Sequence, residues 1–278
     1  MAWRLMSLLL ALQLSGHSGK VYKSRITIFT ERQDREWQGV NSNTGDNHGG
    51  WLVRIMNGNG FFACGGAYYA PLMVLTSGTC IHDYRYALDG ASADTPAVAD
   101  HETENFSLLD TVHTPDDFRH TENFMDIAVV QLGAPIRGVL TEFIKLCTKP
   151  TKVGMNMSSY AWGYGNLDVQ LPTINPKKTY VPVEDLGECQ KKFWELRRKP
   201  TATSLCVTQP KDKMKCRYDP GAPLTWRNEL CGVVSRGSRC WNTSYPGIYT
   251  DIYKVRKFIE DIEEGIENGD IKKKGNLK

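Results

Sequence analysis

Short apolar runs, separated by glycine, proline, asparagine and aspartate, follow one another along most of this chain. They begin at Trp51, and each run is about four to eight residues long, which is typical of β-strands and too short for most helices. The predicted strands are 51–55, 69–75, 106–112, 127–132, 157–162, 178–183, 205–208, 222–226, 230–235 and 247–252. Many short strands with turn residues between them indicate an all-β sandwich or barrel.

Two segments have a helical pattern instead. One is 186–196, which contains Cys189, and the other is 255–266. In the second segment Val255, Ile259 and Ile262 fall on one face, as expected for a helix packed against a core. Residues 263–278 form a charged tail, and we expect its last part, 269–278, to be disordered.

The first residues have the order of a secretory signal peptide. Arg4 gives a positive start, 5–14 is a short apolar run, and 15–19 is small and polar. A membrane span needs about 20 apolar residues, so we predict a cleaved signal peptide over 1–19, a secreted product and no membrane span. Residues 20–36 are polar and charged without a sustained period, which predicts a loose leader.

Eight cysteines follow the signal segment. An even number in a secreted chain predicts four disulfides. The sequence contains no Cys-x2-Cys or His-x3-His spacing, so we expect no metal site and no cofactor. The sequons at Asn105, Asn156 and Asn242 predict glycosylation.

Charge is unevenly distributed although the net charge is only +3. Residues 36–149 hold 6 basic and 14 acidic side chains, whereas 150–278 hold 22 basic and 15 acidic ones. The densest basic stretch consists of Lys191, Lys192, Arg197, Arg198, Lys199, Lys211, Lys213, Lys215 and Arg217. A charge run is usually a solvated face, and a patch that binds a polyanion is the sharper interpretation.

Seven motifs, in order, resemble those of the trypsin/chymotrypsin (S1) family. They are Phe62–Gly66, Val74–Cys80, Met125–Leu132, Ala161–Gly163, Cys216–Leu224, Gly232–Gly237 and Pro246–Thr250. The resemblance implies two six-stranded antiparallel β-barrels with a C-terminal helix and a cleft between the barrels. The first barrel would be roughly 37–149 and the second, with the helix, 150–262.

The same resemblance implies the disulfide pairing. Three bridges match family positions: Cys64–Cys80, Cys189–Cys206 and Cys216–Cys240. The remaining cysteines match less standard positions, and they pair by elimination as Cys147–Cys231.

The positions that would carry the family's catalytic chemistry are changed. Thr79 stands where the resemblance implies the histidine base, Pro220 stands for the serine nucleophile, and Asp126 alone is retained. A threonine hydroxyl is no acid–base catalyst near neutral pH, and proline lacks both a hydroxyl and the backbone N–H of an oxyanion donor. His82, three residues beyond Thr79, is a poor substitute base, and we interpret it as a loop histidine.

The surroundings of the cleft are changed as well. Tyr218 stands for the glycine that supplies the second oxyanion donor, Met214 for the base of the specificity pocket, and Arg236 for an aromatic wall. The chain lacks the family's Ile-Val-Gly-Gly cleavage site before Trp51, so Asp219 would need another partner than a freed N-terminus. Asp126 is interpreted as a buried carboxylate that bonds to the backbone and to hydroxyls such as that of Ser235.

The chain therefore resembles the inactive serine protease homologues that arthropods secrete. The predicted function is non-catalytic protein binding, as a cofactor, decoy or scaffold in a process such as reproduction (seminal fluid) or a protease cascade. The partner would be an extracellular protein. The alternative is a glycosaminoglycan- or polyanion-binding, antimicrobial module on the same fold, and a protease of altered mechanism is the least favoured reading.

Overall fold

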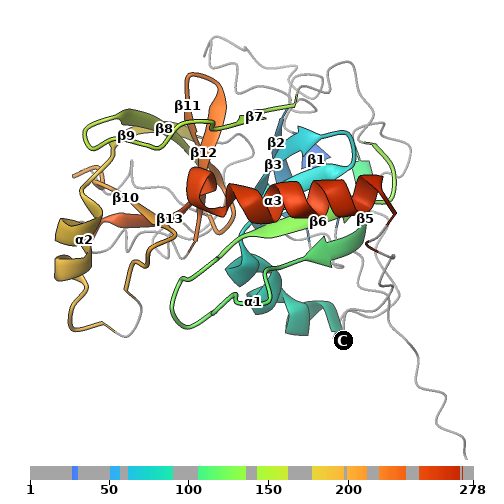
Figure 1. Ribbon diagram of the computed structural model, residues 1–278, viewed down its shortest axis with the longest axis horizontal. Coiled ribbons are helices and arrows are strands. Elements are labelled where there is room, and N and C mark those ends of the chain that lie inside the picture. The colour runs from blue at the N-terminus through green and yellow to red at the C-terminus, as the bar shows by residue number, and fades with distance from the viewer. Residues whose placement is uncertain are drawn as a thin grey trace, which may run out of the picture.

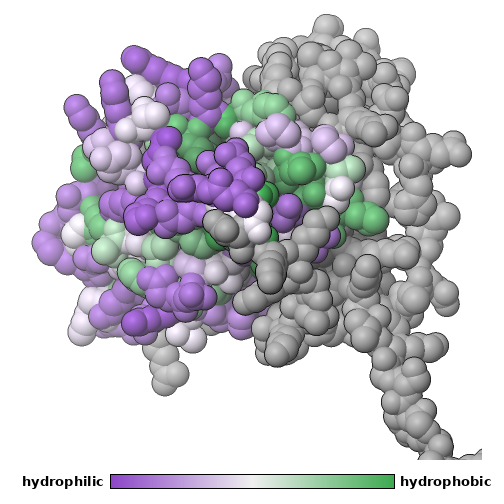
Figure 2. Space-filling view, turned by 45° about the vertical axis from the view of Figure 1, so that its right-hand side comes forward, coloured by the Kyte–Doolittle hydropathy of each residue, from purple (hydrophilic) through white to green (hydrophobic). Residues whose placement is uncertain are grey.

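The computed structural model describes residues 27–30, 51–56, 62–89, 106–135, 143–161, 177–196, 199–211, 219–235, 244–269 and 271. Two curved β-structures lie next to each other, and helix α3 (Ile252–Glu267) runs along the first of them (Figure 1). No helix in this part of the chain is long and apolar enough to cross a membrane. On the face drawn in Figure 2, the coloured residues form hydrophilic areas with smaller hydrophobic ones between them.

Six strands close the first barrel. They are β1 (Thr27–Thr30), β2 (Leu52–Met56), β3 (Phe62–Ala70), β4 (Met73–Thr76), β5 (Phe106–His113) and β6 (Ala128–Leu132). They pair in the order β1-β2-β3-β4-β6-β5, each pair antiparallel, and β1 joins β5 to complete the ring. Leu52, Ile55, Leu75 and Leu132 are buried in the hydrophobic core that these strands form.

The predicted loose leader contains one of these strands. Thr27–Thr30 form β1, with Ile28 opposite Ile55 of β2 and Ser107 of β5. These four residues are β-branched or aromatic, which favours a strand. The sequence alone did not reveal the strand because its hydrogen-bonding partners lie far along the chain. Without β1, the edges of β2 and β5 would have unpaired backbone groups, which explains why the strand forms.

The second sheet comprises β8 (Asn156–Ala161), β9 (Lys177–Pro182), β10 (Ser204–Val207), β11 (Pro223–Trp226), β12 (Glu229–Val234) and β13 (Gly247–Asp251). Its strand order is β10-β13-β12-β11-β8-β9. The two edges meet where Val183 bridges to Val207 and the N–H of Thr208 donates to the carbonyl of Pro182 at 2.9 Å. The sheet therefore curls into a barrel-like shape.

A seventh strand departs from the expected six antiparallel ones. β7 (Lys145–Leu146) lies in the range predicted for the first barrel, yet it pairs with β12 of the second sheet, and it does so in parallel. The next residue, Cys147, explains the pairing. Its N–H donates to the carbonyl of Leu230 at 2.9 Å, and its sulfur is bonded to Cys231.

Three helices are described. α2 (Leu186–Lys192) begins after Asp185, which accepts from the N–H of Glu188, and α3 begins after Asp251, which accepts from the N–H of Tyr253. Both carboxylates are N-caps. Val255 and Ile259 of α3 are buried in the core of the first barrel, so the predicted apolar face is confirmed. This C-terminal helix therefore packs against the first barrel.

The third helix, α1 (Gly78–Asp89), was not predicted. Its start is fixed by local chemistry, because the hydroxyl of Ser77 accepts from the N–H of Cys80 at 3.1 Å. The disulfide Cys64–Cys80 then ties the helix to β3. Its sequence shows no sustained apolar face, which is why periodicity missed it.

Three of the four predicted disulfides lie in the described residues and are formed. They are Cys64–Cys80, Cys147–Cys231 and Cys189–Cys206. The pair Cys216–Cys240 lies outside the described residues, as do the signal segment 1–19, the sequons Asn105 and Asn242, and the tail beyond residue 271. Asn156 is exposed at the start of β8.

Removing Cys147–Cys231 should cost more stability than removing Cys189–Cys206. The sequence separations are 84 and 17 residues, and loop-closure entropy gives about 4.5 and about 3 kcal/mol respectively. All four cysteines are buried, so replacing each pair by alanines leaves similar cavities and makes the two variants matched controls. Urea unfolding should place the Cys147→Ala/Cys231→Ala midpoint lower. Equal midpoints would contradict the loop-entropy account.

Candidate functional site

The carboxylate of Asp126 is the centre of the candidate site. It is fully buried just before β6. The N–H of Thr79 donates to its Oδ1 at 2.6 Å, the Thr79 hydroxyl donates to its Oδ2 at 2.8 Å, and the Ser235 hydroxyl also donates to Oδ2. The backbone carbonyl of Asp126 accepts from Thr250 Oγ1 at 2.7 Å. The interpretation of Asp126 as a buried carboxylate bonded to backbone and hydroxyls, including Ser235, agrees with this geometry.

Three separate elements bring these donors together. Thr79 lies in the first turn of α1, Ser235 follows β12, and Thr250 lies in β13. The approach to Asp126 is a tight turn in which Asn123 and Met125 have φ of 56° and 50°. The N–H of Met125 donates to Thr203 Oγ1 at 3.0 Å, so this turn is held against the second sheet.

Burial raises the pKa of Asp126 above its ordinary value, although the hydrogen bonds from Ser235 and Thr79 oppose the shift. Loss of water penalises the charged form, and here that penalty outweighs the hydrogen bonds that favour it. Within the described part of the chain, the groups that donate hydrogen bonds to this carboxylate are two hydroxyls and one backbone amide.

The turn that contains Pro220 lies against the end of β4. The N–H of Gly65 donates to the carbonyl of Pro220 at 2.9 Å, and Gly221 adopts φ of 78°. A Cβ on Gly221 would collide with Thr76 Oγ1 and with the carbonyl of Gly65, so only glycine fits there. The turn at Pro220 therefore lies next to Thr76 and Ser77, which directly precede α1 and Thr79.

Asp219, beside Pro220, is also fully buried. Near it, burial raises the pKa of Tyr249 to about 12, and the charge of Asp219 adds to the shift. The Tyr249 hydroxyl shares a 2.8 Å hydrogen bond with Ser159. The other changed cleft positions, Tyr218, Met214 and Arg236, lie outside the described residues.

The predicted basic patch is described only in part. Lys191 and Lys192 form ion pairs with Glu188 and Glu184 at 2.6 and 2.8 Å. Lys199 and Lys211 are exposed. The other members, Arg197, Arg198, Lys213, Lys215 and Arg217, lie outside the described residues. Acidic neighbours offset the charge of both described lysines of α2.

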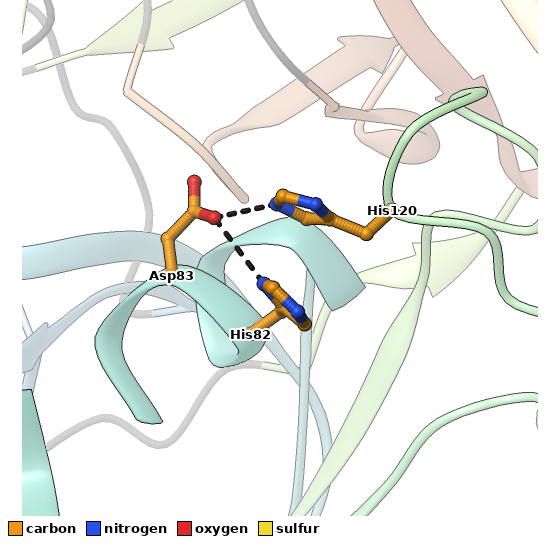
Figure 3. A group of neighbouring side chains, drawn as sticks. All are labelled: His82, Asp83 and His120. Atoms are coloured by element: carbon orange, nitrogen blue, oxygen red, sulfur yellow. Dashed lines mark hydrogen bonds and ion pairs between the residues drawn. The ribbon is translucent and has the colours of Figure 1, made fainter. Parts of the chain in front are cut away.

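A second polar cluster was missed by the sequence analysis. His82, Asp83 and His120 converge at the surface beside α1 (Figure 3). His82 lies within this helix, so its interpretation as a loop histidine is wrong. No sequence spacing indicated this cluster, because His120 lies between β5 and β6, 37 residues after Asp83.

Two barrel-like β-structures, with a carboxylate-centred site where they meet and a C-terminal helix, define the trypsin-like class of proteins. The chain belongs to the trypsin family, because the family model described as Trypsin matches residues 37–259.

Three known proteins illustrate the similarity. Seminase of Drosophila melanogaster is 31% identical over 211 residues, which are 76% of this chain and 76% of Seminase. Trypsin iota of Drosophila melanogaster is 28% identical over 202 residues, covering 70% of this chain and 77% of the relative. The structure of neuropsin, a serine protease expressed in the limbic system of mouse brain, superimposes with a TM-score of 0.60 and 19% sequence identity. The match covers 77% of this chain and 94% of the neuropsin chain, and it supports the fold.

Replacing Asp126 by asparagine should remove a pH dependence of stability. A folded-state pKa that is raised means that the folded protein holds the proton more tightly, so the stabilising effect is full below the unfolded pKa and is lost as pH rises through the folded one. From about pH 4 to about pH 7, wild-type stability should therefore fall relative to Asp126→Asn, as measured by urea unfolding at each pH.

Asp126→Ala is the control for this comparison. It leaves the Thr79 amide and two buried hydroxyls without their acceptor, so it should be less stable than Asp126→Asn by about 3 kcal/mol, and by the same amount at every pH. Parallel pH profiles for the wild type and Asp126→Asn would show that this carboxyl does not titrate with a raised pKa.

Proposed function

We propose that this chain is a secreted, non-catalytic member of the trypsin family that acts by binding an extracellular protein. One observation carries the proposal. The carboxylate that would orient a catalytic base is bonded instead by the amide and the hydroxyl of Thr79, at 2.6 and 2.8 Å. The Thr79 hydroxyl can donate to Asp126, but it cannot take a proton from a nucleophile near neutral pH.

The residue at the nucleophile position supports the same proposal. Pro220 has no hydroxyl to attack a carbonyl and no backbone N–H to donate to an oxyanion. Loss of a single oxyanion donor costs about 3 kcal/mol of transition-state stabilisation. Two of the three triad groups and one donor are therefore missing from the sequence, and little background catalysis would remain.

Secretion is supported by the three disulfides among the described residues and by the predicted signal peptide. Glycosylation at the exposed Asn156 would be consistent with it. We further propose a role as cofactor, decoy or scaffold. A reproductive secretion is the first context to test, because the name of the relative Seminase agrees with the role expected from the sequence. A protease cascade is the second.

Binding of a polyanion is the alternative function, and the described residues favour it less. Lys191 and Lys192, the two patch members on α2, are each paired with a glutamate of this same chain. A heparin column run at rising salt would test it, since binding through a basic face weakens as counterions screen it.

The purified protein should not react with a fluorophosphonate probe and should not hydrolyse peptide or ester substrates. The reason is that no serine stands at position 220 and no histidine at position 79. Trypsin, labelled in parallel, is the control for the probe. Stoichiometric labelling of a folded sample would contradict the non-catalytic proposal.

Restoring two residues should not restore an efficient enzyme. Thr79→His/Pro220→Ser supplies a base and a nucleophile, but the Cβ of Tyr218 disfavours the backbone conformations that glycine allows at this oxyanion position. A backbone N–H that is turned away from the oxyanion lowers kcat by about a hundredfold or more. Adding Tyr218→Gly gives the matched variant, which should turn over an ester substrate faster than the double variant. Turnover of the double variant at the level of an ordinary trypsin would refute this reasoning.

A further inference from the structure

Three metal-binding side chains from two segments converge beside α1. His82 and Asp83 are neighbours on the helix, and His120 reaches them from the segment between β5 and β6 (Figure 3). Asp83 Oδ1 lies 2.6 Å from His120 Nε2 and 3.5 Å from His82 Nδ1, and one donor atom from each residue lies within 4.8 Å of the others. The two imidazole rings stack, with centroids 3.8 Å apart.

This donor set suits zinc. Two imidazole nitrogens and one carboxylate oxygen form a common three-residue zinc set, with the fourth position left open. Zinc–ligand bonds of about 2.0–2.1 Å in a tetrahedron place the ligand atoms roughly 3.3 Å apart. The spacings of 2.6 and 3.5 Å bracket that value, so small side-chain rotations would be sufficient.

Access to the cluster is also suitable. The side chains of His82, Asp83 and His120 are 37%, 48% and 22% exposed, so an ion can enter and its fourth position faces solvent. A plain surface ion pair would contribute little to stability. A role as a surface ion pair therefore does not explain why two stacked imidazoles converge on one carboxylate oxygen. We propose that His82, Asp83 and His120 bind a zinc ion.

The position of the cluster gives the ion a structural effect. Asp83 lies four residues after Thr79 on α1, and His120 lies in the segment that leads to Asp126. An ion bound by all three side chains would cross-link α1, which contains Thr79, to the segment that leads to Asp126. Its open position would accept water or a donor atom from a partner. The inference depends on the fold and on these contacts, not on the loss of catalysis.

Isothermal titration with zinc chloride tests the site directly. The untagged full-length secreted protein is first stripped with a chelator that is then dialysed away. The wild type should bind one equivalent of zinc with a raised unfolding temperature, whereas calcium should produce neither effect, because calcium prefers sites built only of oxygen ligands. His82→Ala and His120→Ala should each weaken zinc binding by about tenfold or more, since even loss of an outer-shell partner has that effect.

Two further variants separate metal binding from other roles. Asp83→Asn keeps an oxygen that can accept from His120 but loses the charge, so it should weaken zinc binding while leaving the metal-free unfolding temperature unchanged. His113→Gln removes an imidazole elsewhere in the first barrel and should bind zinc as the wild type does. Circular dichroism in chelator verifies that each variant is folded. Absence of binding by the wild type, or equal binding by the His82→Ala and His120→Ala variants, would overturn the proposal.

Discussion

The bonds of the buried Asp126 tie the two β-structures to each other. Its carboxylate accepts from Thr79 of the first barrel and from Ser235 at the end of β12, and its backbone carbonyl accepts from Thr250 of β13. A buried carboxylate without partners would cost several kcal/mol. The fold therefore requires these donors whether or not the site performs chemistry.

Threonine at position 79 meets that structural requirement with a smaller group than an imidazole. Its amide and hydroxyl reach both oxygens of the same carboxylate, so one residue satisfies two acceptors. Pro220 fits its turn for a related reason. The turn needs the carbonyl of residue 220 as acceptor for Gly65 and a glycine at 221, and neither need involves the side chain or amide at position 220. These contacts of the turn therefore do not depend on which side chain residue 220 carries.

Local patterns predicted most strands, whereas features fixed by distant partners escaped prediction. The buried face of α3 and the bond between Ser235 and Asp126 follow from periodicity and from motif order, and both can be expected from the sequence. β1 forms by hydrogen bonding to both β2 and β5, which lie far from it along the chain. The start of α1 is fixed by the Ser77 N-cap and by the disulfide of Cys80 with Cys64. The cluster of His82, Asp83 and His120 depends on the same tertiary placement, so no spacing rule could reveal it.

The two polar clusters of the first barrel are connected through electrostatics as well as through α1. A positive charge on His120 lowers the pKa of Asp126, against the larger effect of burial. A divalent cation bound to His120 would place more positive charge near the same carboxylate and would favour its ionised form further. Because such coupling is reciprocal, ionisation of Asp126 would in turn strengthen cation binding. Ionised Asp126 is also the better acceptor for the hydroxyls of Thr79 and Ser235, so a bound cation would strengthen the hydrogen bonds that join the two barrels.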